Sequence, residues 1–201
     1  MVLLEKVLLL DRDSEERRVI AGVTWKGYKS LLAQRGDRLL YRVAYLDGDL
    51  EIVSPSRRHE SQKTLIGNLL EIYFLETDTP YFPMGSTTLK NRVKSAGVEP
   101  DESYCVGENK EIPDLAIEVV VTSGSIDRLE LYGRLGIREV WFWRKEELLV
   151  DVLQEMGGYE KVNRSEVLPD LDLDLLQKCA KNLDPLVAVK QFRRRLQGRE
   201  K

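Results

Sequence analysis

The sequence predicts an α/β protein in which helices cover a mixed β-sheet. Residues 115–121 form an apolar run of strand length. This run is followed by a helical segment over residues 126–135 and by a second β-prone run over residues 139–143. A strand–helix–strand unit of this kind is the usual right-handed crossover between parallel neighbours. Residues 39–53 predict an antiparallel hairpin instead, and residues 56–77 carry apolar side chains at helical spacing.

The N-terminal half is expected to form a short helix, the hairpin and one long helix. Thr24 is a typical N-cap for a helix over residues 24–32, and Gly36 marks the end of that helix. The Asp-Gly pair at 47–48 suits the tight turn of the hairpin. The helix over residues 56–77 is amphipathic, because its apolar positions share one face and its opposite face is polar.

Further strands complete the predicted sheet. Residues 81–89 are β-prone and predict a strand, residues 91–97 predict a loop, and residues 102–106 predict a strand that Asp101 introduces. Residues 148–153 predict another strand beyond the crossover.

The C-terminal part is expected to be helical. The Gly-Gly pair at 157–158 predicts a turn, and helical sequence begins at Pro169 with a break near residues 184–185. We therefore expect a core domain over residues 1–165 and an α-helical C-terminal extension over residues 166–201.

Composition excludes several classes of protein. The chain has 201 residues, of which 42% are hydrophobic and 32% charged, and this balance is typical of a globular protein rather than a disordered one. Its apolar runs fall far short of the roughly 20 residues that span a bilayer, so we expect no membrane segment. Because no secretory cleavage pattern is present and Cys105 and Cys179 have neither disulfide nor zinc spacing, we expect a cytoplasmic protein.

Glu118 is the most unusual residue of the chain, because it lies inside the apolar run over residues 115–121. Carboxylates rarely occupy such buried runs unless a cation, a metal or a proton compensates their charge. Asp101 follows Pro100 seventeen residues earlier, and the two carboxylates could converge on a divalent ion that activates water. Carboxylate oxygens favour Mg²⁺ or Mn²⁺ over Zn²⁺.

Two other interpretations of these carboxylates stay open. Arg128 could neutralise Glu118 in a structural ion pair. Asp101 could be only a turn residue, with Asp114 as the partner of Glu118, because residues four apart on a strand share a face.

The chain has no Gly-rich phosphate loop, dinucleotide fingerprint, nucleophile elbow or HExxH motif. Its single histidine, His59, excludes a catalytic or metal site that needs two histidines from one chain.

An ordered set of motifs resembles a known family. The set comprises Leu50-Glu51-Ile52-Val53-Ser54-Pro55, His59-Glu60, Pro100-Asp101, Pro113-Asp114-Leu115-Ala116-Ile117-Glu118-Val119, Leu129-Glu130-Leu131-Tyr132 and Gly136-Ile137-Arg138-Glu139-Val140-Trp141. This order, over residues 24–153, resembles the putative restriction endonuclease family with its PD-(D/E)xK nuclease-like fold. The resemblance implies a restriction endonuclease-like mixed sheet flanked by helices, with a magnesium-dependent nuclease site at the end of the central strands.

The same resemblance implies roles for individual residues. Asp101 matches the motif aspartate and Glu118 the motif glutamate, and both are expected to ligate the metal. Glu60 matches an additional acidic residue of the family, which is expected to act as a third ligand in catalysis. His59 beside it is expected to contact phosphate or orient the site.

The sequence departs from the family's pattern at the lysine. Val120 stands two residues beyond the motif glutamate, where the motif has lysine. In this family the lysine belongs to the following helix, four residues before a tyrosine, and here that position is Arg128, ahead of Tyr132. Arginine stays protonated, so Arg128 can stabilise developing charge or anchor a phosphate but cannot be a general base. Water activation would then fall to the metal, or Lys94 or Lys63 could compensate.

Positive charge is clustered only locally. The formal net charge of -3 provides no global basic field of the kind that marks many DNA-binding proteins. Arg58 at the start of the long helix and Lys94 in the predicted loop belong to basic clusters that could hold phosphates. We expect these two residues, with His59, to contact the substrate.

The sequence therefore predicts a metal-dependent DNA endonuclease. Asp101, Glu118 and Glu60 would hold Mg²⁺ or Mn²⁺, and Arg128 would stabilise the charge that develops on the phosphate. A homodimer would let the protein reach both strands of DNA. The alternative is a catalytically inactive nuclease-fold protein that binds DNA or a protein partner, which the replacement of lysine by Arg128 favours.

Overall fold

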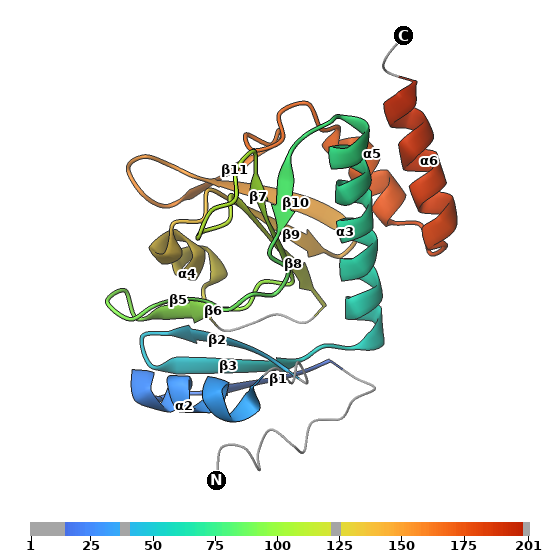
Figure 1. Ribbon diagram of the computed structural model, residues 1–201. Coiled ribbons are helices and arrows are strands. Elements are labelled where there is room, and N and C mark those ends of the chain that lie inside the picture. The colour runs from blue at the N-terminus through green and yellow to red at the C-terminus, as the bar shows by residue number, and fades with distance from the viewer. Residues whose placement is uncertain (1–14, 37–40, 122–125, 199–201) are drawn as a thin grey trace.

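Two β-sheets form the framework of the computed structural model, which describes residues 15–36, 41–121 and 126–198 (Figure 1). The first sheet has the strand order β1-β3-β2-β6-β5 and the second β11-β10-β9-β8-β7-β4. The strands are β1 (Glu16–Ile20), β2 (Arg42–Leu46), β3 (Asp49–Ser54), β4 (Tyr81–Pro83), β5 (Leu89–Asn91), β6 (Ala96–Val98), β7 (Glu102–Val106), β8 (Leu115–Val120), β9 (Glu139–Arg144), β10 (Glu147–Leu153) and β11 (Tyr159–Val162).

The helices are arranged in layers around these sheets (Figure 1). They are α2 (Trp25–Arg35), α3 (Arg57–Glu76), α4 (Arg128–Leu135), α5 (Leu173–Ala180) and α6 (Pro185–Gln197). Helix α2 packs its buried Tyr28 and Leu31 on one face of the first sheet. Helix α4 packs between the two sheets, and α3, α5 and α6 cover the far face of the second sheet.

The second sheet has the mixed character that the sequence predicts. Strands β8 and β9 are parallel neighbours, joined through α4, whereas β7 and β8 are antiparallel. The α/β class and the crossover are therefore confirmed. The hairpin of β2 and β3 belongs to the separate first sheet, whose pairs β2·β3 and β2·β6 are antiparallel.

Local sequence signals explain where most elements begin. The side chain of Thr24 accepts a hydrogen bond from the Gly27 N–H and caps α2, and Ser56 caps α3 in the same way. Asp47 and Gly48 both have positive φ angles of 49° and 100°, as the tight turn between β2 and β3 requires. The predicted helices and the hairpin are confirmed over the described residues, whereas residues 37–40 lie outside them.

The prediction for residues 81–97 is wrong in its details. The expected strand over residues 81–89 is two short strands, β4 and β5, which belong to different sheets. Between them the chain turns at Gly85, whose φ is +54°, and Thr87 N–H donates to the Met84 carbonyl at 3.1 Å. The expected loop over residues 91–97 is a turn over residues 92–95 only, because residue 91 ends β5 and residues 96–97 belong to β6. The chain changes sheets here, which is a tertiary event that local β-propensity does not encode.

The predicted C-terminal helices are present and pack on the core. Asp184 caps α6 and Pro185 is its first residue, which explains the break that the sequence shows. Phe192 of α6 is fully buried and belongs to the same hydrophobic cluster as Trp141 and Trp143 of β9. Strands β1 and β11, which the sequence analysis did not predict, form edges of the two sheets.

Over the described residues, every helix is too short or too polar to cross a bilayer.

Candidate active site

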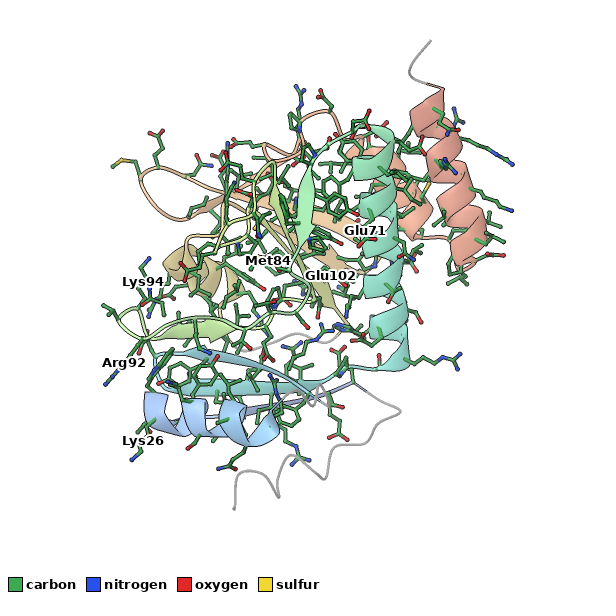
Figure 2. The ribbon with its side chains drawn as sticks, in the orientation of Figure 1. Lys26, Glu71, Met84, Arg92, Lys94 and Glu102 are labelled. Atoms are coloured by element: carbon green, nitrogen blue, oxygen red, sulfur yellow. The ribbon has the colours of Figure 1, made fainter. Side chains whose placement is uncertain are left out.

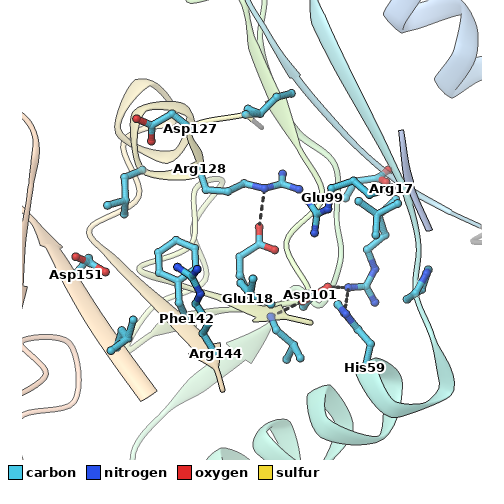
Figure 3. A pocket seen from close by; sticks show the side chains of 18 residues that line it. Arg17, His59, Glu99, Asp101, Glu118, Asp127, Arg128, Phe142, Arg144 and Asp151 are labelled. Carbon is cyan, nitrogen blue, oxygen red and sulfur yellow. Dashed lines mark hydrogen bonds and ion pairs between the residues drawn. The ribbon is translucent and has the colours of Figure 1, made fainter. Parts of the chain in front are cut away.

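A pocket of about 440 Å³ lies between the two sheets (Figure 3). Residues of β1, β2 and β3 in the first sheet and of β8, β9 and β10 in the second line it, together with residues at the beginnings of α3 and α4. Both Asp101 and Glu118 line this pocket. The structure thus brings the two predicted carboxylates to one cavity.

The strand register explains why these carboxylates meet. Asp101 directly precedes β7, whose first residue, Glu102, lies opposite Ile117 of β8, so the chain brings Asp101 beside the part of β8 that carries Glu118. The Asp101 N–H donates to the Ile117 carbonyl at 3.1 Å, which holds the chain at this point. Both side chains line the pocket. Both are buried, with exposed fractions of 2% and 8%.

Asp101 is held by three partners. Its Oδ2 accepts a hydrogen bond from the Val119 N–H at 2.6 Å. Its Oδ1 lies 3.0 Å from His59 Nε2 and forms an ion pair with Arg42. The aspartate is therefore an anchored, charge-compensated group and not a simple turn residue.

Glu118 contacts two side chains of α4. The Tyr132 hydroxyl donates to Glu118 Oε1 at 2.5 Å, and Arg128 Nε lies 3.9 Å from the same oxygen. Burial and the negative charge of Glu118 raise the pKa of Tyr132 well above its usual value, so the phenol remains a donor. The ion pair between Glu118 and Arg128 that the sequence left open is present in the structure (Figure 3).

Arg128 is the residue of the lysine position, and it is the first residue of α4. Its Nη2 donates to Glu51 Oε1 at 2.5 Å. Burial alone would lower the pKa of Arg128, but the charges of Glu118 and Glu51 outweigh this effect and raise it, so the guanidinium keeps its charge. Among the described residues that line the pocket the cations are arginines, with no lysine.

His59 and Glu60 occupy different surroundings at the beginning of α3. His59 is buried between two carboxylates, with Nδ1 3.0 Å from Glu15 Oε2 and Nε2 facing Asp101. Glu60 is 42% exposed and accepts from Arg42 at 2.8 Å and from Lys63 at 3.3 Å. It does not line the pocket, and Arg42 connects it to Asp101. The metal-ligand role of Glu60 stays a prediction.

The other predicted substrate contacts lie away from the pocket walls. Arg58 is exposed on α3. Lys94 is exposed in the turn between β5 and β6, at the outer edge of the molecule, where its carbonyl accepts from Arg134 (Figure 2). Asp114, the alternative partner for Glu118, binds the Val106 N–H at 2.8 Å and Lys110 at 2.7 Å, and it is not part of the pocket wall.

Sequence analysis missed several charged residues of this site. Glu51 of β3 is completely buried and contacts Arg17 and Arg128. It lies in an apolar run, so the argument that identified Glu118 could also have found it. No comparable signal marks Arg17 or Arg42, because single arginines in strands are common surface residues.

The donor chemistry of the pocket fits a hard divalent cation. Asp101 and Glu118 offer carboxylate oxygens at one place, and Mg²⁺ commonly uses only one or two protein carboxylates with water and phosphate oxygens completing its shell. Within residues 15–36, 41–121 and 126–198 there is no cluster of three or more Asp, Glu, His or Cys side chains suited to one ion. Because each carboxylate is paired with an arginine, a metal would compete with Arg42 and Arg128.

Comparisons with known proteins find a matching family and a similar solved structure. A family model described as "Putative restriction endonuclease" (Uma2) matches residues 25–184. A comparison with curated proteins finds no match. Among solved structures, a putative nuclease belonging to DUF820 from Anabaena variabilis ATCC 29413 is similar, with 13% sequence identity and a TM-score of 0.40, over 75% of this chain and 90% of that chain.

Proposed function

The chain belongs to the putative restriction endonuclease family, and on this premise we propose that it is a metal-dependent nuclease that hydrolyses phosphodiester bonds of DNA. The observation that carries the proposal is that Asp101, just before β7, and Glu118 of β8 line the same pocket and are both buried. Two carboxylates that line one pocket provide the oxygen donors that such chemistry needs.

Asp101 and Glu118 would hold Mg²⁺ or Mn²⁺ in this pocket. When bound, the ion would supply Lewis-acid stabilisation and a more acidic water. The Val119 N–H fixes the Asp101 carboxylate, and the Tyr132 hydroxyl fixes that of Glu118, so each is oriented by its own donor. Such contacts keep ligands in place and restrict their rotamers.

Arg128 would stabilise negative charge on the phosphate. Its guanidinium is charged and lies on the pocket wall beside Glu118. It donates hydrogen bonds and takes no proton, so it cannot act as the general base that a lysine could be. His59 would orient Asp101 through the 3.0 Å contact, and Glu60 would act on the same group through Arg42.

Arg58 and Lys94 are proposed to contact phosphates beyond the pocket, on the surface of a longer DNA substrate. A homodimer is proposed to bring two sites to the two strands, and we propose a cytoplasmic location for this activity. Light scattering of the protein in solution would test the dimer.

A second candidate function is supported by the arginine pairs. Arg42 contacts Asp101 and Arg128 lies beside Glu118, so both carboxylates already have cationic partners. A protein in which these ion pairs persist would bind DNA or a protein partner without cutting it.

Incubation with plasmid DNA and Mg²⁺ or Mn²⁺ distinguishes the two functions. For an active nuclease, we expect cleavage by the wild type and a loss of at least about 100-fold in Glu118→Gln, because the amide no longer supplies a charged ligand. Asp114→Asn is the matched control, since it changes a carboxylate just before the same strand that lies outside the pocket.

Two results would favour the inactive protein. The first is wild-type protein that does not cut while Arg128→Lys does. The second is calorimetry in which Mn²⁺ binds the wild type and Glu118→Gln equally, because the proposed carboxylate site would then not hold the metal.

A further inference from the structure

Glu51 is a buried carboxylate between two arginines. It lies on β3 and is completely buried. Arg17 Nη1 of β1 lies 2.8 Å from Glu51 Oε1, and Arg128 Nη2 of α4 lies 2.5 Å from the same oxygen. One carboxylate oxygen thus joins residues that are more than a hundred positions apart in the sequence.

Sheet register explains the direction of Arg17. It lies opposite Val53 on β3, and its neighbour Arg18 lies opposite Ile52. Ile52 packs in the cluster under α2, so Arg18 belongs to the α2 face of the sheet and Arg17 to the pocket face. Figure 3 shows Arg17 and Arg128 approaching the pocket from different elements.

Within the described part of the chain, the hydrogen bonding of Glu51 and Arg128 is incomplete. Arg128 Nη1 and Glu51 Oε2 are both buried, and neither has a hydrogen-bond partner there. An unpaired buried donor on a cation is unfavourable unless an anion or water meets it. Arg128 lines the pocket, so an acceptor in the pocket would meet its guanidinium group, and a shift of this side chain would bring the enclosed Nη1 to the acceptor.

We propose that Arg17 and Arg128, joined by Glu51, form a binding site for one phosphate group. The guanidinium group presents its donors in a planar fork that matches the oxygens of a phosphate. Glu51 acts as a positioning residue, because it holds both guanidinium groups on one wall before any ligand arrives. The identity of this phosphate as part of the DNA substrate rests on the proposed function, whereas phosphate binding itself does not.

Calorimetric titration with inorganic phosphate tests the site in the full chain, with a chelator present to remove divalent metals. We expect phosphate to bind the wild type and to bind Arg17→Ala about tenfold more weakly, as expected for the loss of a hydrogen bond to a charged group. Arg18→Ala is the matched control, because it removes an equal charge from the next residue on the opposite face, and it should leave the affinity unchanged.

Several results would overturn the proposal. The first is a wild-type protein that does not bind phosphate, and the second is equal phosphate affinity of the wild type and Arg17→Ala. The third is a loss of phosphate affinity in Arg18→Ala as large as in Arg17→Ala, which would indicate a general charge effect. If Arg17→Ala fails to fold by circular dichroism, Arg17→Lys replaces it. Lysine keeps the charge but loses the fork, so the affinity should still fall; unchanged affinity in this variant would also count against the site.

A second titration uses a short duplex DNA in the same chelator at several salt concentrations. We expect Arg17→Ala to reduce the slope of log affinity against log salt by about one, as for one lost phosphate contact, and Arg18→Ala to leave it unchanged. An unchanged slope in Arg17→Ala would show that the site does not serve DNA. Neither titration requires DNA cleavage by the protein. Phosphate binding by a protein that does not cleave DNA would therefore reject the proposed nuclease activity and retain the proposed phosphate site.

Discussion

At the scale of single residues, the buried and partly buried acidic side chains differ in how their charge is compensated. Glu99 is bound by Arg35, by Thr88 at 2.7 Å and by the Val43 N–H at 3.2 Å. The charge of Glu102 is less closely compensated, because Lys63 Nζ lies 3.7 Å from Glu102 Oε1. Burial raises the pKa of Glu102, and the charges of Lys63 and Arg42 only partly oppose this effect. The ionised form of Glu102 therefore costs the folded state free energy.

The substitution Glu102→Gln should stabilise the protein at pH 7. Because the folded-state pKa is raised, the wild type loses stability as the pH rises through the carboxyl range, and a neutral amide avoids this loss. We expect a gain of about 1 kcal/mol or less at pH 7, disappearing toward pH 4, in thermal unfolding followed by circular dichroism.

Asp47→Asn provides the opposite case. A hydrogen bond from Arg134 lowers the pKa of Asp47, so this charge favours folding and its removal should reduce stability at pH 7. Asparagine tolerates the positive φ at this position, so the backbone should not obscure the result.

A Glu102→Gln protein that is less stable than the wild type at pH 7 would contradict the interpretation of Glu102.

At the scale of elements, α4 sets the chemistry of the pocket. Arg128 and Tyr132 are four residues apart and therefore lie on one face of the helix, where both contact Glu118. The helix begins at Arg128 because the side chain of Asp127 accepts from the Glu130 N–H at 3.0 Å. It ends at Gly136, whose φ is 84°, in the left-handed conformation that favours glycine.

Removal of this cap should lower both the stability of the protein and its activity. Asp127→Ala is expected to cost about 1 kcal/mol of unfolding free energy, and DNA cleavage should fall because the first turn carries Arg128. Asp127→Asn keeps a capping side chain and should restore both quantities. Asp184→Ala, which removes the equivalent cap of α6, should cost similar stability and leave cleavage unchanged. Equal cleavage by Asp127→Ala and the wild type would show that the cap does not position Arg128.

At the scale of the whole molecule, the C-terminal helices and the second sheet share one hydrophobic core. Ala188, Phe192 and Leu196 of α6 belong to the cluster that includes residues of α3 and β8. Gln62 of α3 donates to the Ala180 carbonyl at 2.9 Å, and Arg193 pairs with Glu76 at 2.6 Å. We therefore expect residues 166–198 to unfold together with the rest of the protein.

The substitution Phe192→Ala tests this coupling. A completely buried phenylalanine should cost about 3–5 kcal/mol when truncated, and the loss should appear in one cooperative transition. Tryptophan fluorescence, which reports on Trp25 of α2 and on Trp141 and Trp143 of β9, and far-ultraviolet circular dichroism should give coincident denaturation curves. Leu186→Ala on the same helix is the control, since that side chain is 61% exposed. Separate transitions for the two signals would show that the extension is an independent unit.

Much of this protein follows from patterns that are local in the chain. The caps at Thr24 and Ser56, the Asp-Gly turn and the crossover through α4 are all local signals, and each element appears where its signal predicts. Glu118 was identifiable because a charge in an apolar strand is costly wherever that strand lies. The division of residues 81–97 between two sheets was not predictable, because both parts have similar local propensity.

Sequence patterns alone were enough to establish the α/β class, the main helices and the unusual position of Glu118. Only the folded chain shows that Asp101 and Glu118 line one pocket, that Arg42 and Arg128 pair with these carboxylates, and that Arg17 meets Glu51. The physical reason is that helix periodicity and turn geometry are properties of neighbouring residues, whereas the partner of a buried charge depends on strand register and on the packing of two sheets. Those interactions act between distant parts of the chain and leave no local pattern.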